Sequence, residues 1–368
     1  MKLSKANLAD LSSGAVFLAT GGGGDPYVSY LAACSAIDQH GPVQLLSVHD
    51  LADDARVAAI GGVGAPSVAM ELLPSQDDPA NALECFEQHV GYSLDALVSF
   101  EVGGGNSMIP IIAAAGRGIP VIDGDGMGRA LPEAQMMTYP IAGIAPTPAV
   151  ALDYAGNLVT FATDSTATYE RHLRAVTQAM GGMVTTVEHP MSGRELKDSV
   201  VPDTISFSIE LGRILRENQG DAHELIAPLR SAFADSLYGD LFHLYTGKVV
   251  DSSSSVVGGY DVGEAIIEGF DRDVEPLHLS IKNEFLMARV GARTLATVPD
   301  LITVLDFETA TPINAERLRY GQRVTVIGIG CPAIYRTERA LAFVSPRCFG
   351  FDQDYIEIER LQDLGRFK

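Results

Sequence analysis

The sequence has few of the residues that build metal clusters or disulfide frameworks. Its cysteines are four scattered residues without any Cys-x-x-Cys pair: Cys34, Cys85, Cys331 and Cys348. Its eight histidines show no His-x-His or His-Glu-x-x-His spacing. A structural zinc site and a disulfide scaffold are therefore not indicated, and reduced thiols are typical of a cytoplasmic protein.

Positive charge is also scarce. The 368 residues include 26 Lys and Arg against 47 Asp and Glu, which gives a net charge of −21. Nucleic acids and anionic membranes bind proteins through Lys and Arg, so the sequence predicts neither as a partner. A small-molecule substrate and other protein chains, including further copies of this one in a homo-oligomer, are the expected partners.

Long apolar runs are absent as well. No unbroken stretch approaches the roughly 18 residues of a membrane span. The first residues, Met1 to Lys5, lead into an amphipathic pattern and not into the apolar core of a signal peptide. We therefore expect a cytoplasmic protein without a transmembrane segment.

The first half of the chain alternates short apolar strands with helices. Strands are predicted at residues 43–48, 57–60, 96–100 and 119–122, and helices at residues 79–90 and 108–115. This alternation is typical of an α/β domain with a mostly parallel sheet. From residue 244 strand-like runs follow one another, which predicts a second, β-rich domain. One large domain with insertions is the alternative.

Glycine-rich loops follow three of the predicted strands, at residues 61–66, 101–106 and 123–126. The carboxyl ends of parallel strands lie at one edge of a sheet, and ligands of open α/β sheets bind outside that edge. We therefore expect the three loops to line one binding cleft, with Glu101 and Asp123 facing each other. Asn106 most simply caps the helix that follows it, and a hydrogen bond to a ligand amide is the alternative.

The third loop continues into a segment with four charged residues, Asp123, Asp125, Arg129 and Glu133. Its glycines allow a backbone to approach a ligand closely, and Pro132 before Glu133 is typical of the first turn of a helix. The segment predicts a ligand site, although Asp-Gly pairs are also ordinary turn formers.

A run of four glycines between two predicted helices is a second candidate site. Asp25 can cap the second helix, so Gly22, Gly23 and Gly24 lie at a helix N-terminus, where free N–H groups favour an anion or a carbonyl. A dinucleotide-binding loop needs a strand before its glycines and a Gly-x-Gly-x-x-Gly spacing, and this run has neither. No nucleotide cofactor is therefore expected, and a plain interhelix turn is the alternative.

Near the end of the chain, Arg347 can clamp a carboxylate with its planar guanidinium, and a surface ion pair is the alternative. Cys331 and Cys348 have no histidine beside them in the sequence. This argues against either thiol as a nucleophile.

Motifs spread over nearly the whole chain resemble those of a known family. They are TGGGGDPY from Thr20, EVGGGN from Glu101, DGD from Asp123, GRA from Gly128, PE from Pro132, KNE from Lys282, VPDLI from Val298, RYG from Arg319 and PRCFG from Pro346. Together they closely resemble the S-methyl thiohydantoin desulfurase family.

The resemblance implies an N-terminal α/β domain over residues 1–165 and a C-terminal domain over residues 166–368. The latter would be helical over residues 166–240, β-rich and of the swivelling type over residues 241–330, and closed by a helix and loop over residues 331–368. It also implies a hydrolase, because studied members cleave an S-methylated thiohydantoin to methanethiol and a hydantoin. Relatives are expected to act on other five-membered cyclic amides, and a hydantoinase-type protein is an expected partner.

The implied reaction needs a base for water, a proton donor, and hydrogen bonds that fix the ring. We expect Glu101 or Asp123 as the base, with the other as donor and Asp125 orienting one of them, because neighbouring carboxylates separate their pKa values. The N–H groups of residues 22–24 and of the loop containing Gly104 and Gly105 would hold ring carbonyls. Arg129 or Arg347 would hold a substrate carboxylate.

Two alternatives use the same residues differently. Glu101, Asp123 and Asp125 can instead hold a divalent metal ion, so the sequence leaves metal binding open. The chain can also be a non-catalytic, small-molecule-binding subunit of a hydantoinase-type enzyme.

Overall fold

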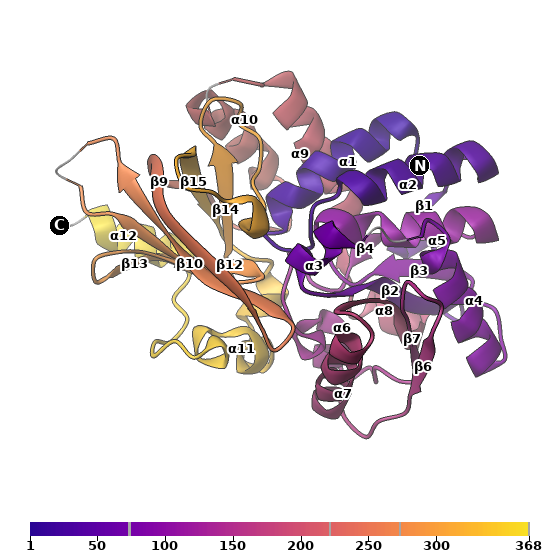
Figure 1. Ribbon diagram of the computed structural model, residues 1–368. Coiled ribbons are helices and arrows are strands. Elements are labelled where there is room, and N and C mark those ends of the chain that lie inside the picture. Colours follow the sequence, from indigo (N-terminus) through magenta and orange to yellow (C-terminus); the bar gives the residue numbers. More distant parts are fainter. Residues whose placement is uncertain (73–74, 221, 272–273, 367–368) are drawn as a thin grey trace.

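The computed structural model describes residues 1–72, 75–220, 222–271 and 274–366. An α/β half and a β-rich half lie side by side, each built around its own sheet (Figure 1). The predicted fold class, an α/β domain followed by a β-rich one, is confirmed.

The α/β half is built on one mixed sheet whose centre is parallel. The parallel strands lie in the order β1 (Leu45–Ser47), β4 (Val121–Asp125), β3 (Ala96–Ser99) and β2 (Arg56–Gly64). Antiparallel strands extend the sheet beyond β2 as β7 (Met183–Ser192), β5 (Ala149–Leu152) and β6 (Leu158–Phe161), and β8 (Val201–Pro202) pairs with β4. All four residues of β3 are buried, as expected for a central strand covered on both faces.

Helices pack around this sheet, and the last of them, residues 222–234, also contacts the β-rich half, where Ala222 N–H donates to the carbonyl oxygen of Phe307 at 3.2 Å. They are α1 (Lys5–Leu18), α2 (Tyr27–His40), α3 (Pro66–Glu71), α4 (Asp78–Val90), α5 (Ile109–Arg117), α6 (Thr138–Ala142), α7 (Thr166–Ala179), α8 (Gly193–Lys197), α9 (Thr204–Glu217) and α10 (Ala222–Ala234), with 3-10 turns η1 (Val48–Asp50), η2 (Gly104–Ser107) and η3 (Ala134–Met136). Ser4 begins α1 with a capping box, and Gly118 ends α5 in the left-handed conformation. Within the described part of the chain, every helix is too short or too polar to cross a bilayer.

Three local expectations were wrong. The strand β2 continues through Gly64, where the sequence predicted a loop, because β7 pairs with residues 61–64 in antiparallel register. Residues 132–133 do not begin a helix but precede the 3-10 turn η3. The segment predicted as helical, residues 166–240, also contains β7 and β8, which join the first sheet.

The β-rich half is an antiparallel sheet of seven strands. Their order is β13 (Arg293–Thr297), β12 (Glu284–Val290), β11 (Leu277–Lys282), β10 (Tyr260–Gly269), β9 (Leu241–Val257), β15 (Arg323–Ile329) and β14 (Leu301–Asp306). Turns η4 (Ala315–Arg317), η5 (Ala333–Arg336) and η6 (Pro346–Phe349) and helices α11 (Glu338–Val344) and α12 (Ile358–Arg366) complete it. Val249, Ile267 and Leu279 belong to its own apolar core.

Close packing and backbone hydrogen bonds join the halves. A Cβ at Gly21, which follows α1, would lie 2.6 Å from Cε2 of Phe285 in β12. The glycine run after α1 then contacts the β-rich half, since Thr20 O accepts from Phe285 N–H at 2.7 Å and Gly21 O from Ala315 N–H at 2.9 Å. The run is therefore held between the two sheets.

Candidate functional site

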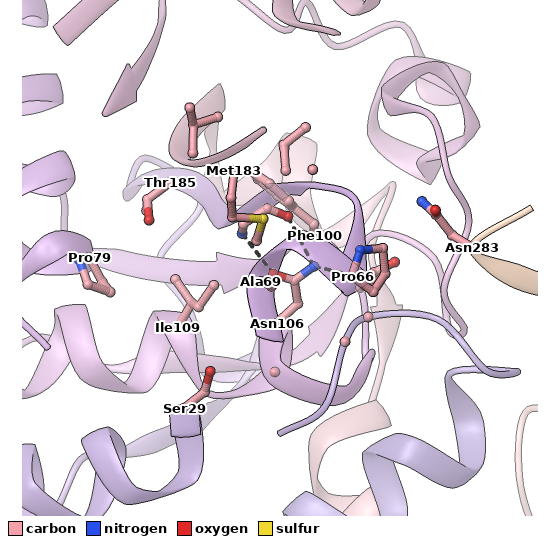
Figure 2. A pocket seen from close by; sticks show the side chains of 18 of the residues that line it. Ser29, Pro66, Ala69, Pro79, Phe100, Asn106, Ile109, Met183, Thr185 and Asn283 are labelled. Carbon is pink, nitrogen blue, oxygen red and sulfur yellow. Dashed lines mark hydrogen bonds between the residues drawn. The ribbon is translucent and has the colours of Figure 1, made fainter. Parts of the chain in front are cut away.

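A cavity of about 610 Å³ lies where the glycine run, the ends of β2 and β3, and the start of β12 meet. Its size is typical of a small-molecule site. Figure 2 shows Asn106 near its centre, with Ile109 and Ser29 on one side and Met183 and Thr185 on the other. Asn283 contributes to the lining from the β-rich half.

Glu101 follows β3 and lines this cavity. Its side chain is buried, and burial raises its pKa to about 7. Two donors oppose that shift by stabilising the carboxylate: Asn106 Nδ2–H donates to Oε1 at 2.8 Å, and Leu131 N–H to Oε2 at 3.3 Å. Glu101 therefore has an environment suited to a base that is ionised near neutral pH.

Glu284, the first residue of β12, lines the same cavity from the β-rich half. Burial, and next the charge of Glu101, raise its pKa well above the usual range. Its Oε2 has no hydrogen-bond partner among the described residues. Burial and the neighbouring charge of Glu101 therefore favour the protonated form of Glu284.

Glycine in the run after α1 makes this approach possible. A Cβ at Gly22 would lie 2.3 Å from Oε1 of Glu284, and a Cβ at Gly23 would lie 2.3 Å from the carbonyl carbon of Gly103. Gly23 also has a φ of +70°, which glycine adopts without strain. The run consequently passes close to Glu284 and to the backbone of Gly103, which a side chain at Gly22 or Gly23 would prevent.

Asn106 ties two of the predicted loops together. Its Oδ1 accepts from Gly62 N–H at 2.7 Å while its Nδ2 donates to Glu101. The prediction that Asn106 caps the next helix was wrong, since Met108 occupies the N-cap of α5. The expected meeting of the loops at residues 61–66 and 101–106 is borne out by these contacts.

The third loop is arranged differently. Asp123 Oδ1 accepts from Ser206 N–H of α9 at 2.9 Å. Asp123 is not among the described residues that line the cavity. Asp125 is fully buried and is not among the lining residues, and it accepts from Met127 and Gly128 N–H groups at 2.5 and 2.6 Å. Burial raises its pKa to about 7. The expectation that Asp123 faces Glu101 was therefore wrong, and Asp125 contacts its own turn.

Arg129 is fully buried and acts as a link between the halves. Its Nη1 donates to the carbonyl oxygens of Pro299 and Asp300 at 2.8 Å each, and its Nη2 to Thr20 Oγ1 at 2.7 Å. Like Asp125, it lies outside the described cavity lining.

The remaining predicted ligand-binding residues divide into two groups. Those in the described lining are Gly23, Gly24, Asp25, Gly105, Asn106 and Glu133, and those outside it are Gly22, Gly104 and Arg347. Within the lining, Asp25 accepts from Tyr27 N–H and pairs with Arg317, while Glu133 pairs with Lys282. Arg347 is half exposed and pairs with Asp352 and Asp354, as in the surface alternative.

Neither candidate cysteine has the environment of an activated thiol. Cys331 is buried, and burial raises its pKa well above the usual range. Cys348 is exposed beside Ser345, outside the described cavity lining.

Several lining residues were not predicted. Besides Glu284, they include Glu170 and Arg174 of α7, which form an ion pair of 2.9 Å, and Glu188 of β7, which accepts from Tyr169. For Glu284, one signal was present in the sequence, namely its place in the KNE motif beside Asn283. Its pairing with Glu101 depends on the contact between the halves.

The described residues do not fit the suggested metal site. Asp123 turns toward α9, away from Glu101, and the described part of the chain contains no group of three His, Cys, Asp or Glu side chains placed to hold a metal ion. The set of Glu101, Asp123 and Asp125 is therefore not assembled as a coordination sphere.

Comparisons with known proteins bear on both halves of the chain. A crystal structure of a protein from Chromobacterium violaceum superposes with a TM-score of 0.81 at 22% identity, covering 97% of this chain and 100% of that one, and so has the same fold. No curated protein matched the sequence. Residues 6–163 match the family described as S-Me-THD-like, N-terminal domain, and residues 163–358 match S-Me-THD-like, C-terminal domain. The chain therefore belongs to the S-Me-THD-like family, as the resemblance to S-methyl thiohydantoin desulfurases predicted.

Proposed function

We propose that this protein is a hydrolase that cleaves S-methyl thiohydantoins to methanethiol and a hydantoin. The observation that carries the proposal is the pair of buried carboxyl groups, Glu101 and Glu284, in one cavity. The family name relates the chain to S-methyl thiohydantoin, and the reaction type is inferred from the chemistry of this pair.

The two glutamates have unlike surroundings, which separates their roles. Glu101 receives two hydrogen bonds on its carboxylate oxygens and is the base. Among the described residues, no group donates a hydrogen bond to Oε2 of Glu284. Burial and the charge of Glu101 disfavour the ionised form of Glu284. Glu284 is the acid, by the rule that unlike environments give two carboxyls opposite functions.

In the first step, water attacks the ring carbon that carries the methylthio group, and Glu101 takes a proton from the water as the C–O bond forms. Glu284 gives its proton to the adjacent ring nitrogen, so the C=N double bond becomes a single bond. The product of this step is a neutral tetrahedral intermediate.

In the second step, the C–S bond breaks as the carbonyl forms. The hydroxyl proton passes to Glu284, and the departing methanethiolate takes the proton held by Glu101. Both glutamates return to their starting states, and one water has been consumed for each methanethiol and hydantoin formed.

A thiol-release assay with hydantoin detection by mass spectrometry tests the proposal. The purified chain should release methanethiol and hydantoin in equal amounts from an S-methyl thiohydantoin. Glu101→Gln should lower kcat by about 100-fold or more, the size expected for loss of a general base. Hydantoins and oxoproline are run beside it, because ring opening of either would point to a different cyclic-amide hydrolase.

Asp123→Asn provides the matched comparison, since Asp123 is a carboxylate in the neighbouring strand β4 whose side chain contacts α9. Near-normal turnover of Asp123→Asn, together with a large loss of turnover in Glu101→Gln, supports the assignment. The reverse result would make Asp123 the base. Association with a hydantoinase-type protein, a homo-oligomeric state and a cytoplasmic location stay predictions.

A further inference from the structure

The turn that carries Glu284 presents a second polar side chain to the cavity. Asn283 is the single residue between β11 and β12, and its φ of +58° lies in the left-handed region. Successive side chains of a regular strand point to opposite faces. The left-handed residue interrupts that alternation, and Asn283 and Glu284 both line the cavity. Figure 2 shows the amide end of Asn283 directed from the β-rich half toward the other labelled residues.

Hydrogen bonds that involve both halves fix this amide. Asn283 N–H donates to the carbonyl oxygen of Asp261 at 2.7 Å, and Asn283 Oδ1 accepts from Asp261 N–H at 2.8 Å. The carboxylate of Asp261 in turn accepts from the hydroxyl and N–H groups of Ser67 in α3, at 2.6 and 3.0 Å. Because the atom that faces Asp261 N–H is an acceptor, it is the amide oxygen. The orientation of the amide is therefore set, and Nδ2 is the polar atom that remains for other contacts.

This Nδ2 group is available to a ligand. It has no acceptor among the described residues, and unlike Oε2 of Glu284 it is not fully enclosed by protein atoms. The amide of Asn106 differs, since its Nδ2 already donates to Glu101 Oε1 at 2.8 Å and to the carbonyl oxygen of Gly62 at 3.3 Å. Asn283 thus supplies an oriented donor, next to the acid, that the described protein does not itself use.

We infer that Asn283 is a substrate-binding residue whose Nδ2 group donates to the ring carbonyl oxygen of the thiohydantoin. This inference rests on the proposed function, which places the ring at Glu101 and Glu284. In the tautomer whose C=N bond is conjugated with the ring carbonyl, the carbonyl carbon is bonded to the nitrogen that Glu284 protonates. Two consecutive residues of one turn then contact neighbouring atoms of one ring.

The hydrogen bond from Asn283 becomes stronger as the reaction proceeds. When water attacks the carbon that bears the methylthio group, the electron pair of the C=N bond moves to the ring nitrogen and, by conjugation, toward the carbonyl oxygen. Glu284 protonates the nitrogen, and Asn283 stabilises the share of the charge on oxygen while that proton is transferred. A donor aimed at a developing charge in this way is expected to raise kcat by about 10- to 100-fold.

Calorimetric binding of two ligands to the full-length protein tests the contact without requiring turnover. One is a hydantoin, and the other is the matching 2-imidazolidinone, which lacks the carbonyl group in question. The unmodified protein should bind the hydantoin about tenfold more tightly or better. Asn283→Gly keeps the left-handed turn without strain and should lose that preference. A loosened turn would instead weaken the binding of both ligands equally, so a preference that survives in Asn283→Gly overturns the inference.

Asp203→Gly is the matched control. Asp203 also has a left-handed backbone, with a φ of +61°, but it is exposed and lies outside the described lining. This variant should keep both the preference and the turnover of the unmodified protein. Thiol release from the matching S-methyl thiohydantoin is measured in parallel. If the unmodified protein releases no methanethiol, the proposed function fails, whereas normal release by Asn283→Gly defeats only the inference about Asn283.

Discussion

Replacing Asn106 with alanine should move the acidic limb of the pH profile upward. The change removes the 2.8 Å hydrogen bond that stabilises the Glu101 carboxylate. A hydrogen bond to a charged group contributes about 1.5–3 kcal/mol, and one pKa unit corresponds to about 1.4 kcal/mol. The pKa of Glu101, now about 7, should therefore rise by about one to two units in the variant.

The consequence for rate depends on pH. Glu101 acts as the ionised base, so half a unit below a pKa of 7 about a quarter of the protein is active, but only about 1% once the pKa reaches 8.5. Asn106→Ala should therefore lose about 20-fold in kcat/KM at slightly acidic pH and recover most of it at alkaline pH. The measurement is kcat/KM for thiol release across this range.

Asn157→Ala is the matched control. It also deletes an asparagine-to-carboxylate hydrogen bond of 2.8 Å, to Asp153 in the β5–β6 turn, outside the described cavity lining. Its profile should coincide with that of the unmodified protein. A loss in Asn106→Ala that is the same at every pH would refute the reasoning, because it would mean that Asn106 positions the loops and does not tune Glu101.

Three further predictions concern the other unusual residues. Glu284→Gln should lower kcat for thiol release by about 100-fold or more, because an amide cannot supply the proton. The pKa of buried Glu316 is raised from 4.5 to about 7, so its contribution to stability is complete below about pH 4.5 and is lost as the pH rises to about 7. That loss is about 3 kcal/mol. Urea unfolding of Glu316→Gln on both sides of this pH window should show that this pH-dependent part of the free energy of unfolding is absent. Gly23→Ala should destabilise the fold more than Gly24→Ala in the same assay: both have positive φ, but an added Cβ meets the backbone of Gly103 only at Gly23 and open space at Gly24.

Strand ends were the part of the site that the sequence predicted well. Parallel strands deliver their carboxyl ends to one edge, so Glu101 after β3 was expected at the cleft and lies there. Asp123 was misplaced because β4 is longer than its apolar run. The strand continues to Asp125, paired with Ser99 and with β8, so Asp123 lies inside the strand and contacts α9.

Glu284 could not be assigned by the same reasoning. Hydrophobic periodicity predicts that the residues of β12 form a strand, but it carries no information about which element of the other half lies opposite the first residue of that strand. The same holds for Arg174 and Glu188, which reach the cavity because β7 and α7 join the α/β half. Contacts between distant segments determine that these residues reach the cavity, whereas local sequence patterns were enough to place Glu101 there.

The glycine run explains why an acid and a base from different halves can share one cavity. The carbonyl oxygens of Thr20 and Gly21 accept hydrogen bonds from the N–H groups of Phe285 and Ala315 in the β-rich half. The hydroxyl oxygen of Thr20 also accepts a hydrogen bond from Arg129. Those bonds fix the residue next to Glu284, while Gly22 leaves the space that the carboxyl group occupies. The position of the acid relative to Glu101 is thus set by the junction itself. Any change that loosens the junction should therefore reduce catalysis, and it should also lower the free energy of unfolding, because the apolar core of the first sheet extends into β12, β14 and β15 of the β-rich half through Leu286, Leu301 and Ile329.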